Sequence, residues 1–555
     1  MHMTTVDSQP DDESGRVPAI DILRAVAHAR PDALCVVGPG STRRTQEEFV
    51  DRVRRFSWAL HREGLGCHRE RSELDCHESG QDHMAILMLN RPEYLESMMG
   101  AFAARVVPFN VNHRYTASEL VDVLTDARAT AIVVESSLLP TLSVALEQLP
   151  GLRTVFCVGE SDEDTIDFET ALAEAPLGHP PVTPSADDLY LLYTGGTTGR
   201  PKGVMWRNGD AVIECFDASR APQPLDAFVD QMRPDLRSLT CAPFMHGAGQ
   251  WTALRALLAG GCVVIPEHTD RLVPADIWRT VERESVTLLG IVGESFARPL
   301  LDELEHGDYD PGSLNVVLTG GAPLSARTKA RLLDALPTVM IVDGFGSSES
   351  GGQMSIVSTA GAATSGVFRP RLNRTVVLSA DRTKVLGPGS QEVGWLATGG
   401  RLPLGYLGDP ELTARAYPVV DGVRFTAPGD HARRLADGTI EALGRESVCI
   451  NTGGEKVYAE EVEDAVLRHR SVHDCIVVGR PSETWGSEVA AVISLVHPDI
   501  KAPSPHELSK LMNDLSRYKH PKAVIVVDHI ERTPAGKADY AWARAIASEG
   551  APENN

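Results

Sequence analysis

Between about residue 30 and residue 345, short apolar runs rich in β-branched residues alternate with longer stretches of helical periodicity. This alternation predicts βα units around mostly parallel sheet. The runs are ALCVVGPG, AILMLN, AIVVES, TVFCVGE, CVVIPE, VTLLGIVGE, LNVVLTGG and TVMIVDGFG. Because parallel sheets bind ligands at the carboxyl ends of their strands, we expect the chemistry at the glycine-rich ends of such runs.

The pattern changes after residue 360 to shorter, turn-rich runs such as TVVLS, GVRFTAPGD and GTIEALGR, which favour a small antiparallel barrel. From about residue 446 a compact α+β unit is predicted, with helices around EEVEDAVLRH and HELSKLMNDLS and strands at DCIVVG, VAAVISLV and AVIVVDHI. The sequence therefore predicts an α/β protein. Its large N-terminal domain, residues 1–445, combines βα-layered subdomains with a small β-barrel, and residues 446–555 form a small α+β C-terminal domain.

Composition narrows the class of protein. The chain has 555 residues, of which 42% are hydrophobic and 23% charged, as in a globular protein of several domains. Its 53 basic and 76 acidic residues give a formal charge of −23, which argues against duplex nucleic acid as a partner. An anionic ligand must therefore be held by local groups.

The cysteines and the apolar runs indicate the compartment. Nine scattered cysteines do not resemble a secreted disulfide framework, the N-terminal segment is polar and acidic, and no apolar run approaches the roughly 18 residues of a membrane span. We expect a reduced, cytoplasmic protein without a membrane span. One cluster raises the question of zinc, but its CH-x7-CH spacing is unusual for a zinc finger and its charged surroundings favour an extended surface loop; it comprises Cys67, His68, Cys76, His77 and His83.

A loop rich in glycine and threonine follows the apolar run LYLLY. Its sequence, YTGGTTGRPKG, supplies backbone N–H groups, hydroxyl donors and a cation, the set that a polyphosphate needs. Taken alone, the segment reads equally well as a flexible surface loop. A Walker-type loop is disfavoured, because no GK[ST] occurs here. The candidate phosphate-binding residues are Thr194, Gly195, Gly196, Thr197, Thr198, Gly199 and Lys202.

Further motifs follow this loop in order, among them FMHGA, NTGGEKVY and PAGKADYAWA. With YTGGTTGRPKGVMWR they make nearly the whole chain resemble the adenylate-forming (ANL) acyl-CoA synthetases, which share their fold with firefly luciferase. The resemblance is strongest to actinobacterial fatty-acyl-CoA synthetases, including those that activate steroid side chains. It implies an ATP- and Mg²⁺-dependent ligase that makes an acyl-AMP and then an acyl-CoA thioester from coenzyme A.

The resemblance assigns the nucleotide site residue by residue. Small residues can lie beside a purine, an aromatic ring can stack on it and a carboxylate can accept from its amino group. Adenine is thus assigned to Gly321, Ala322, Pro323, Asp343, Gly344 and Phe345, the α-phosphate to Ser348, Mg²⁺ to Glu349, and the ribose to Asp430 and Arg445. Without the resemblance, the charged members of this set would read as ordinary solvated residues. Gly405, Tyr406 and Thr413 fit a further motif that we interpret as structural.

Two residues are candidates for catalysis. The resemblance makes Lys537 the lysine that bridges the substrate carboxylate and the α-phosphate, although the local sequence alone favours a solvated lysine. His246 is either a packed or capping histidine or a residue at the junction of the nucleotide and acyl pockets. The resemblance also implies that the C-terminal domain is mobile and presents Gly453 and Gly454 to CoA. Ala459 stands where relatives have proline, which predicts a looser entry into the next helix.

Other functions remain open at this point. One is an acyl-AMP ligase that loads a carrier protein, although no insertion is evident between about residues 350 and 430. Another is a catalytically silent nucleotide-binding protein, against which Lys537 and Glu349 argue. The motifs favour a medium-to-long fatty acid or a steroid carboxylate over acetate, while aromatic acids stay open. A homodimer is compatible with the sequence.

Overall fold

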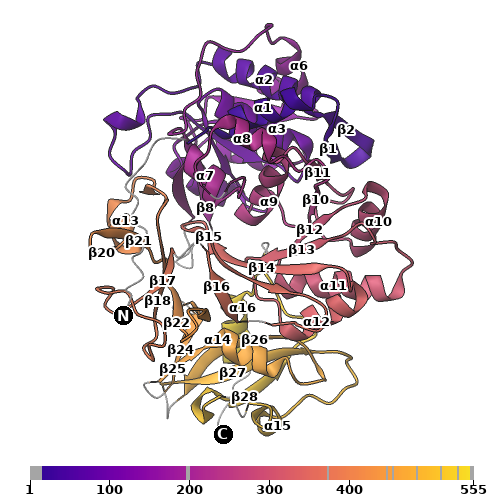
Figure 1. Ribbon diagram of the computed structural model, residues 1–555, viewed down its shortest axis with the longest axis vertical. Coiled ribbons are helices and arrows are strands. Elements are labelled where there is room, and N and C mark those ends of the chain that lie inside the picture. Colours follow the sequence, from indigo (N-terminus) through magenta and orange to yellow (C-terminus); the bar gives the residue numbers. More distant parts are fainter. Residues whose placement is uncertain are drawn as a thin grey trace.

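The computed structural model describes residues 16–194, 201–219, 221–364, 366–371, 374–445, 448–452, 455–482, 486–512, 515–533 and 537–549. Two large sheets and their helices form a broad upper body, and a smaller unit lies below it (Figure 1). None of the described helices is both long and apolar enough to span a membrane.

Fifteen of the described strands form the larger sheet, in the order β2-β1-β11-β10-β12-β13-β14-β15-β16-β23-β22-β18-β21-β20, with β17 paired to β18. The strands from β1 to β14 in this order are parallel, and those from β15 onward are antiparallel. The bounds are β1 Leu34–Gly38, β2 Thr42–Thr45, β10 Arg237–Thr240, β11 Cys262–Val264, β12 Leu288–Ile291, β13 Val316–Gly320, β14 Met340–Ser347, β15 Gly351–Ser358, β16 Val367–Pro370, β17 Thr375–Leu378, β18 Gly394–Gly399, β20 Val419–Val420, β21 Val423–Thr426, β22 Asp430–Arg434 and β23 Ile440–Arg445.

The second sheet has eight strands among the described residues, in the order β19-β9-β8-β4-β3-β5-β6-β7. Its strands from β4 through β7 are parallel, whereas β8, β9 and β19 form an antiparallel edge. The bounds are β3 His83–Leu87, β4 Val107–Asn110, β5 Ala129–Glu135, β6 Thr154–Val158, β7 Ile166–Asp167, β8 Leu189–Thr194, β9 Lys202–Arg207 and β19 Gly405–Tyr406.

Helices separate and cover these sheets. One apolar core joins both sheets through α1, α2, α3 and α9, while α4 and α5 cover the far face of the second sheet and α10, α11 and α12 that of the first. The layers are therefore α/β/α/β/α, as alternating βα units require. The bounds are α1 Ala19–Ala29, α2 Gln46–Arg62, α3 Pro92–Ala103, α4 Ala117–Asp126, α5 Leu139–Leu146, α6 Phe168–Ala173, α7 Asn208–Glu214, α8 Leu225–Asp230, α9 Gly247–Leu258, α10 Pro274–Glu284, α11 Gly293–His306, α12 Ala326–Ala335 and α13 Pro410–Ala416.

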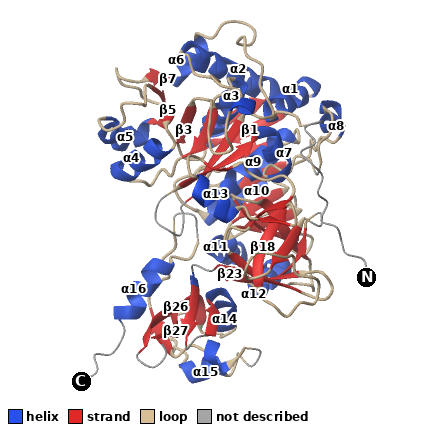
Figure 2. Ribbon diagram, turned by 90° about the vertical axis from the view of Figure 1, so that its left-hand side faces the viewer, coloured by secondary structure: helices blue, strands red, loops and turns tan. Residues whose placement is uncertain are grey.

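The C-terminal unit has its own cores and stands apart from the body in the side view (Figure 2). A three-stranded sheet, β26-β27-β28, carries α14 on one face and α16 on the other, beside the hairpin β24-β25. The bounds are β24 Cys449–Thr452, β25 Glu455–Tyr458, α14 Ala459–Val466, β26 Val472–Ser482, β27 Gly486–Leu495, α15 Pro505–Ser509, β28 Ala523–Val526 and α16 Tyr540–Glu549. The domain boundary at residues 445/446 stays a prediction, since 446–447 lie outside the described residues.

The α/β fold class predicted from the sequence is confirmed, since all eight apolar runs become strands at the expected places. The strands after residue 360 are antiparallel, and they continue the larger sheet through β15 and β16. One detail differs, because the predicted helix over 506–516 ends as α15 at Ser509. At the start of α14, the Tyr458 N–H donates to Glu461 Oε1 at 3.2 Å. The looser entry expected from Ala459 stays a prediction.

Candidate active site

Strand β13 ends at Gly320, opposite Gly344 of the neighbouring parallel strand β14. A Cβ at Gly320 would lie 2.9 Å from the carbonyl oxygen of Gly344, so the strand ends approach too closely for a side chain. Gly321 follows with φ +79°, a left-handed conformation that favours glycine. The segment from Gly321 to Pro323 therefore lies at the carboxyl edge of the sheet, where a ligand is expected.

Asp343 on β14 is buried and paired with a lysine that the sequence did not single out. Lys329 on α12 is fully buried; its Nζ donates to Asp343 Oδ2 at 2.7 Å and to the carbonyl oxygen of Thr364 at 2.8 Å. Burial raises the pKa of Asp343, and Lys329 opposes that rise. One carboxylate oxygen is thus bound to Lys329, while the other can accept from a ligand.

The last residues of β14 and the turn after it carry the next candidates. The ring of Phe345 is half-buried and meets Phe368 edge-on, with ring centroids 5.6 Å apart. Trp206 on β9 donates its indole N–H to the carbonyl oxygen of Ser348 at 2.8 Å. This hydrogen bond ties the turn to the second sheet, so that the two sheets together define the position of Ser348 and Glu349.

Glu349 is oriented by Tyr406 on β19, whose hydroxyl donates to Glu349 Oε1 at 2.9 Å. Burial and the adjacent carboxylate raise the pKa of Tyr406, which keeps the phenol protonated as a donor. Thr413 supports the tyrosine from behind by accepting the Tyr406 N–H at 3.0 Å. A Cβ at Gly405 would lie 2.4 Å from the Thr413 side chain, which explains the glycine. Tyr406, which we interpreted from the sequence as structural, thus contacts the proposed metal ligand.

Asp430 and Arg445 lie directly opposite each other on the antiparallel strands β22 and β23. Arg445 Nε donates to Asp430 Oδ1 at 3.1 Å, and Asp430 is buried. The charge of Asp430 is the main cause of the raised pKa of Arg445, with a further contribution from Glu349. The structure therefore brings this pair close to the turn that carries Glu349.

Lys537 reaches the same space from the C-terminal unit. Its Cε lies 4.0 Å from the position that a Cβ of Gly321 would occupy. Its side chain is exposed to solvent, while protein surrounds it at longer range. This partial loss of water lowers its pKa, as does the charge of Arg445, while Glu349 and Asp430 oppose the shift. The lysine thus lies among the residues assigned to the nucleotide.

His246 directly precedes α9 and makes no side-chain capping hydrogen bond, which removes capping as its role. Its buried Nε2 has no hydrogen-bond partner among the described residues. Burial lowers the pKa of His246 to about 4, and the charges of Lys537 and His113 contribute. His246 is therefore neutral at pH 7 and close to Lys537. His113 has an equally unpartnered buried Nδ1 and was not singled out from the sequence.

The glycine and threonine loop begins and ends at a defined place. Thr194 at the end of β8 pairs with Lys202 at the start of β9. Lys202 Nζ lies 5.9 Å from the ring centroid of Tyr406, so both ends of the loop lie near the proposed metal ligand. Five candidate residues of the loop lie outside the described residues and stay predictions, namely Gly195, Gly196, Thr197, Thr198 and Gly199, as do Gly453 and Gly454.

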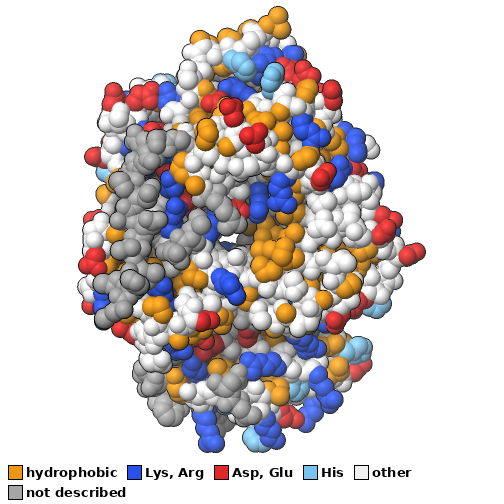
Figure 3. All heavy atoms as spheres, in the orientation of Figure 1, with side chains coloured by type: hydrophobic (Ala, Val, Ile, Leu, Met, Phe, Trp, Pro, Cys, Tyr) orange, Lys and Arg blue, Asp and Glu red, His pale blue; other side chains and the backbone are white. Residues whose placement is uncertain are grey.

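On the face seen in Figure 3, a hollow lies near the middle, with hydrophobic side chains beside it and Lys and Arg side chains around it.

Residues 23–406 match the family model described as AMP-binding enzyme, and residues 461–537 match the model of its C-terminal domain. This chain belongs to the AMP-binding enzyme family.

Related AMP-binding enzymes match along almost the full chain. A medium-chain acyl-CoA ligase from Mycobacterium avium is 44% identical, over 96% of this chain and 98% of its own. A 3-oxocholest-4-en-26-oate–CoA ligase from Rhodococcus rhodochrous is 34% identical, over 95% and 96%. Among solved structures, the anthranilate CoA ligase AuaEII in complex with anthranoyl-AMP has a TM-score of 0.81 at 21% identity and covers 96% of this chain and 98% of its own, which shows the shared fold.

The described candidate residues of this AMP-binding enzyme come from both sheets and the C-terminal unit, and Glu349, Asp430, Arg445 and Lys537 lie close together. The sequence did not point to Lys329 or His113, because each is recognised only by its neighbour in the folded chain. Lys329 contacts Asp343, and His113 lies near His246. The cluster considered for zinc does not converge: among the described residues no three such side chains could hold a metal ion. His68 Nε2 lies 2.6 Å from Asp82 Oδ2, and buried His83 contacts Ser79 Oγ at 2.7 Å. All nine cysteines are described, and none of them forms a disulfide bond.

Proposed function

We propose that this chain is an AMP-forming acyl-CoA ligase that activates a medium- or long-chain fatty acid or a steroid side-chain carboxylic acid. The supporting observation is the position of Lys537 beside Gly321, within the electrostatic reach of Arg445, Glu349 and Asp430. A catalytically silent nucleotide-binding protein would have no need of a lysine at that place.

In the first step, a carboxylate oxygen of the acid attacks the α-phosphorus of ATP. The new P–O bond forms as the bond from the α-phosphorus to the β-phosphate oxygen breaks, giving acyl-AMP and pyrophosphate. Asp343 holds the adenine amino group, Asp430 the ribose hydroxyls, and Lys537 offsets the charge that accumulates between the two anions. No proton has to move, so positioning and charge neutralisation dominate this step.

The phosphates are held by the loop between β8 and β9, by its flanking residues and by the turn after β14. Thr194, Lys202 and Ser348 contact them together with the loop of residues 195–199. Glu349 fits a Mg²⁺ ion, because one carboxylate oxygen accepts from Tyr406 and the other makes no hydrogen bond to the described residues. When bound, Mg²⁺ neutralises phosphate charge. The negative Glu349 would otherwise repel the triphosphate.

In the second step, the thiol sulfur of CoA attacks the carbonyl carbon of acyl-AMP. The bond from that carbon to the AMP oxygen breaks, AMP leaves, and the thiol proton passes to water. We propose that the C-terminal domain, from residue 446, reorients for this step and brings Gly453 and Gly454 to the pantetheine. Neutral His246 lies at the junction of the nucleotide and acyl spaces and places no charge against the apolar chain.

A small pocket that is open to solvent lies at the carboxyl ends of β4 and β10. Pro243, Ile277 and Phe296 line it together with the charged Arg114 and Arg271, and His113 lines it near His246. We propose this space for the acyl chain. The medium-chain and steroid acids in the names of the relatives define the sizes to test first.

The experiment is an AMP-release assay with ATP, Mg²⁺ and CoA across short, medium, long, aromatic and steroidal acids. We expect CoA-dependent AMP release with medium or long fatty acids or with the steroid acid. AMP release that proceeds with a carrier protein as acceptor and not with CoA would make the chain an acyl-AMP ligase instead. ATP binding without turnover of any acid would make it a binding protein.

Two further properties are part of the proposal. The proposed use of ATP and CoA supports action in the cytoplasm, where both are available. A homodimer is our expectation for the assembly. Light scattering of the purified chain and fractionation of cells test these two points.

A further inference from the structure

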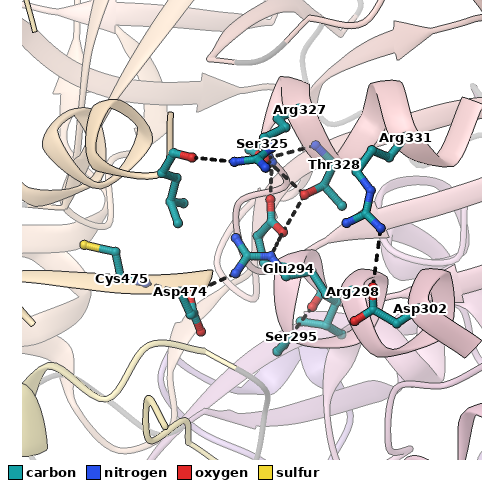
Figure 4. Close-up of polar contacts among 12 residues, drawn as sticks. Glu294, Ser295, Arg298, Asp302, Ser325, Arg327, Thr328, Arg331, Asp474 and Cys475 are labelled. Atoms are coloured by element: carbon teal, nitrogen blue, oxygen red, sulfur yellow. Dashed lines mark hydrogen bonds and ion pairs between the residues drawn. The ribbon is translucent and has the colours of Figure 1, made fainter. Parts of the chain in front are cut away.

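A series of contacts made by charged side chains joins the N-terminal body to the C-terminal unit (Figure 4). Arg298 on α11 donates from Nε to Glu294 Oε2 at 2.6 Å. On its other side, Arg298 Nη1 lies 3.8 Å from Oδ1 of Asp474 at the start of β26. A second contact runs in parallel, because Arg327 Nη1 on α12 donates to the carbonyl oxygen of Leu467 at 3.3 Å.

On the side of the N-terminal body, Glu294 is held in place beside residues 321–323, the segment that we assign to adenine. Glu294 Oε1 accepts the Ser325 N–H at 2.8 Å, and Glu294 Oε2 accepts the Thr328 hydroxyl at 2.8 Å. The Glu294 N–H donates to the carbonyl oxygen of Pro323 at 3.1 Å. Arg298 is therefore fixed to the segment that we assign to adenine, and its rotamer freedom is largely removed before it meets the C-terminal unit.

On the side of the C-terminal unit, the contacts continue from Asp474 to the segment that contains Lys537. The β26–β27 register shifts between Val472 and Asp474, which turns Asp474 out of the regular strand alternation. Asp474 accepts two hydrogen bonds of 2.7 Å from Arg532 Nη2, one at each carboxylate oxygen. Arg532 pairs with Ala538 in an isolated bridge, next to Lys537. Through Arg532, Asp474 thus stabilises the position of the segment that contains Lys537.

The contact between Arg298 and Asp474 is largely buried from solvent. The side chains of Arg298 and Asp474 are 12% and 15% exposed. Arg298 Nη1 is buried and has no hydrogen-bond partner among the described residues, so Asp474 is the charge that faces it. In such surroundings an ion pair is screened less than at an open surface.

We propose that Arg298 is a positioning residue for the first half-reaction: through Asp474 and Arg532 it holds the C-terminal unit in the pose that places Lys537 beside Gly321. This inference rests on the proposed function. The contact crosses between units that must separate for the second half-reaction, so it favours the adenylation pose alone. A contact of this kind shifts an equilibrium only by its differential energy between the two poses.

The test compares Arg298→Met, Arg298→Lys and Arg331→Met. Arg331 on α12 is the matched control, because its ion pairs to Asp302 and Glu305 stay within the body. We measure pyrophosphate release with acid and ATP, thioester formation from supplied acyl-AMP and CoA, and amide hydrogen exchange over 472–477 and 324–331. A thermal melt of each variant reports folding.

We expect Arg298→Met to slow pyrophosphate release by roughly three- to thirtyfold and to speed exchange in both segments, while thioester formation stays unchanged or rises. Arg298→Lys should recover much of the rate, and Arg331→Met should behave as wild type. Equal loss of both half-reactions, or no loss of either in a folded variant, would overturn the inference. A wild-type chain without CoA-dependent AMP release would instead overturn the proposed function.

Discussion

The hydroxyl of Tyr406 lies 2.9 Å from Glu349 Oε1 and joins the edge of the second sheet to the turn after β14 in the first. The buried phenol keeps its proton and therefore restricts the carboxylate to one orientation. The proposed metal ligand Glu349 thus depends on a contact between two layers of the fold, made by two residues that lie 57 positions apart in the chain.

Tyr406→Phe removes this donor and should raise the Mg²⁺ concentration needed for half-maximal pyrophosphate release by about 10-fold, because a loosened ligand binds the ion less well. The measurement is a Mg²⁺ titration at saturating ATP and acid. Tyr417→Phe is the control, because Tyr417 lies against Tyr406 and makes no hydrogen bond to Glu349. An unchanged Mg²⁺ dependence in Tyr406→Phe would remove the positioning role of the phenol.

Glu349→Gln keeps the size of the side chain and removes its charge. We expect a larger effect than in Tyr406→Phe, on the order of 100-fold in the Mg²⁺ requirement, because a neutral amide is a weak ligand for a hard cation. The same titration measures it. If Glu349→Gln needs no more Mg²⁺ than wild type, Glu349 is not the metal ligand.

Lys329→Met leaves the buried carboxylate of Asp343 without its partner. Breaking one side of a buried pair costs about 3–5 kcal/mol of folding stability, so the variant should melt well below wild type and bind ATP weakly. Lys329→Met/Asp343→Asn carries neither unpaired charge and should recover most of the stability. Thermal melts and the KM for ATP measure both effects. A single variant as stable as wild type would show that the pair contributes little.

Glu463 on α14 makes the stability of the C-terminal unit depend on pH. Burial raises the pKa of Glu463 from 4.5 to about 8, although the Val477 N–H donates to its Oε1 at 2.8 Å. Between these two values the folded chain binds the proton and the unfolded chain does not. The contribution of this group to stability is therefore complete below pH 4.5 and is lost as pH rises toward about 8.

Glu463→Gln removes that titration, so its melting temperature relative to wild type should be higher at pH 9 than at pH 6. Melts of both proteins across this range measure the difference. Asp528→Asn, which changes an exposed carboxylate of the same unit, should show a constant difference. A pH-independent difference for Glu463→Gln would place the raised pKa in doubt.

The strands and the order of motifs could be predicted from the sequence because each depends on local pattern. The run LNVVLTGG reads directly as a buried strand with a glycine end, and β13 with Gly321 is what forms. Lys329 could not be found in this way. A lysine on an amphipathic helix reads as solvated, and only the packing of α12 against β14 buries it against Asp343.

Tyr406 shows a second limit of local pattern. Its motif predicts a structural residue, and the support from Thr413 agrees with that prediction. Its contact with Glu349 arises only when the edge of the second sheet meets the turn of the first. The link from Arg298 through Asp474 to Arg532 is equally non-local, since its members come from three separate segments.

The most direct test of the account is Lys537→Ala measured in the two half-reactions. We expect pyrophosphate release from acid and ATP to fall by at least about 100-fold, because the cation that offsets the two approaching anions is gone. Thioester formation from supplied acyl-AMP and CoA should stay close to wild type. Pyrophosphate release near the wild-type rate would contradict the assignment of Lys537 to the adenylation step.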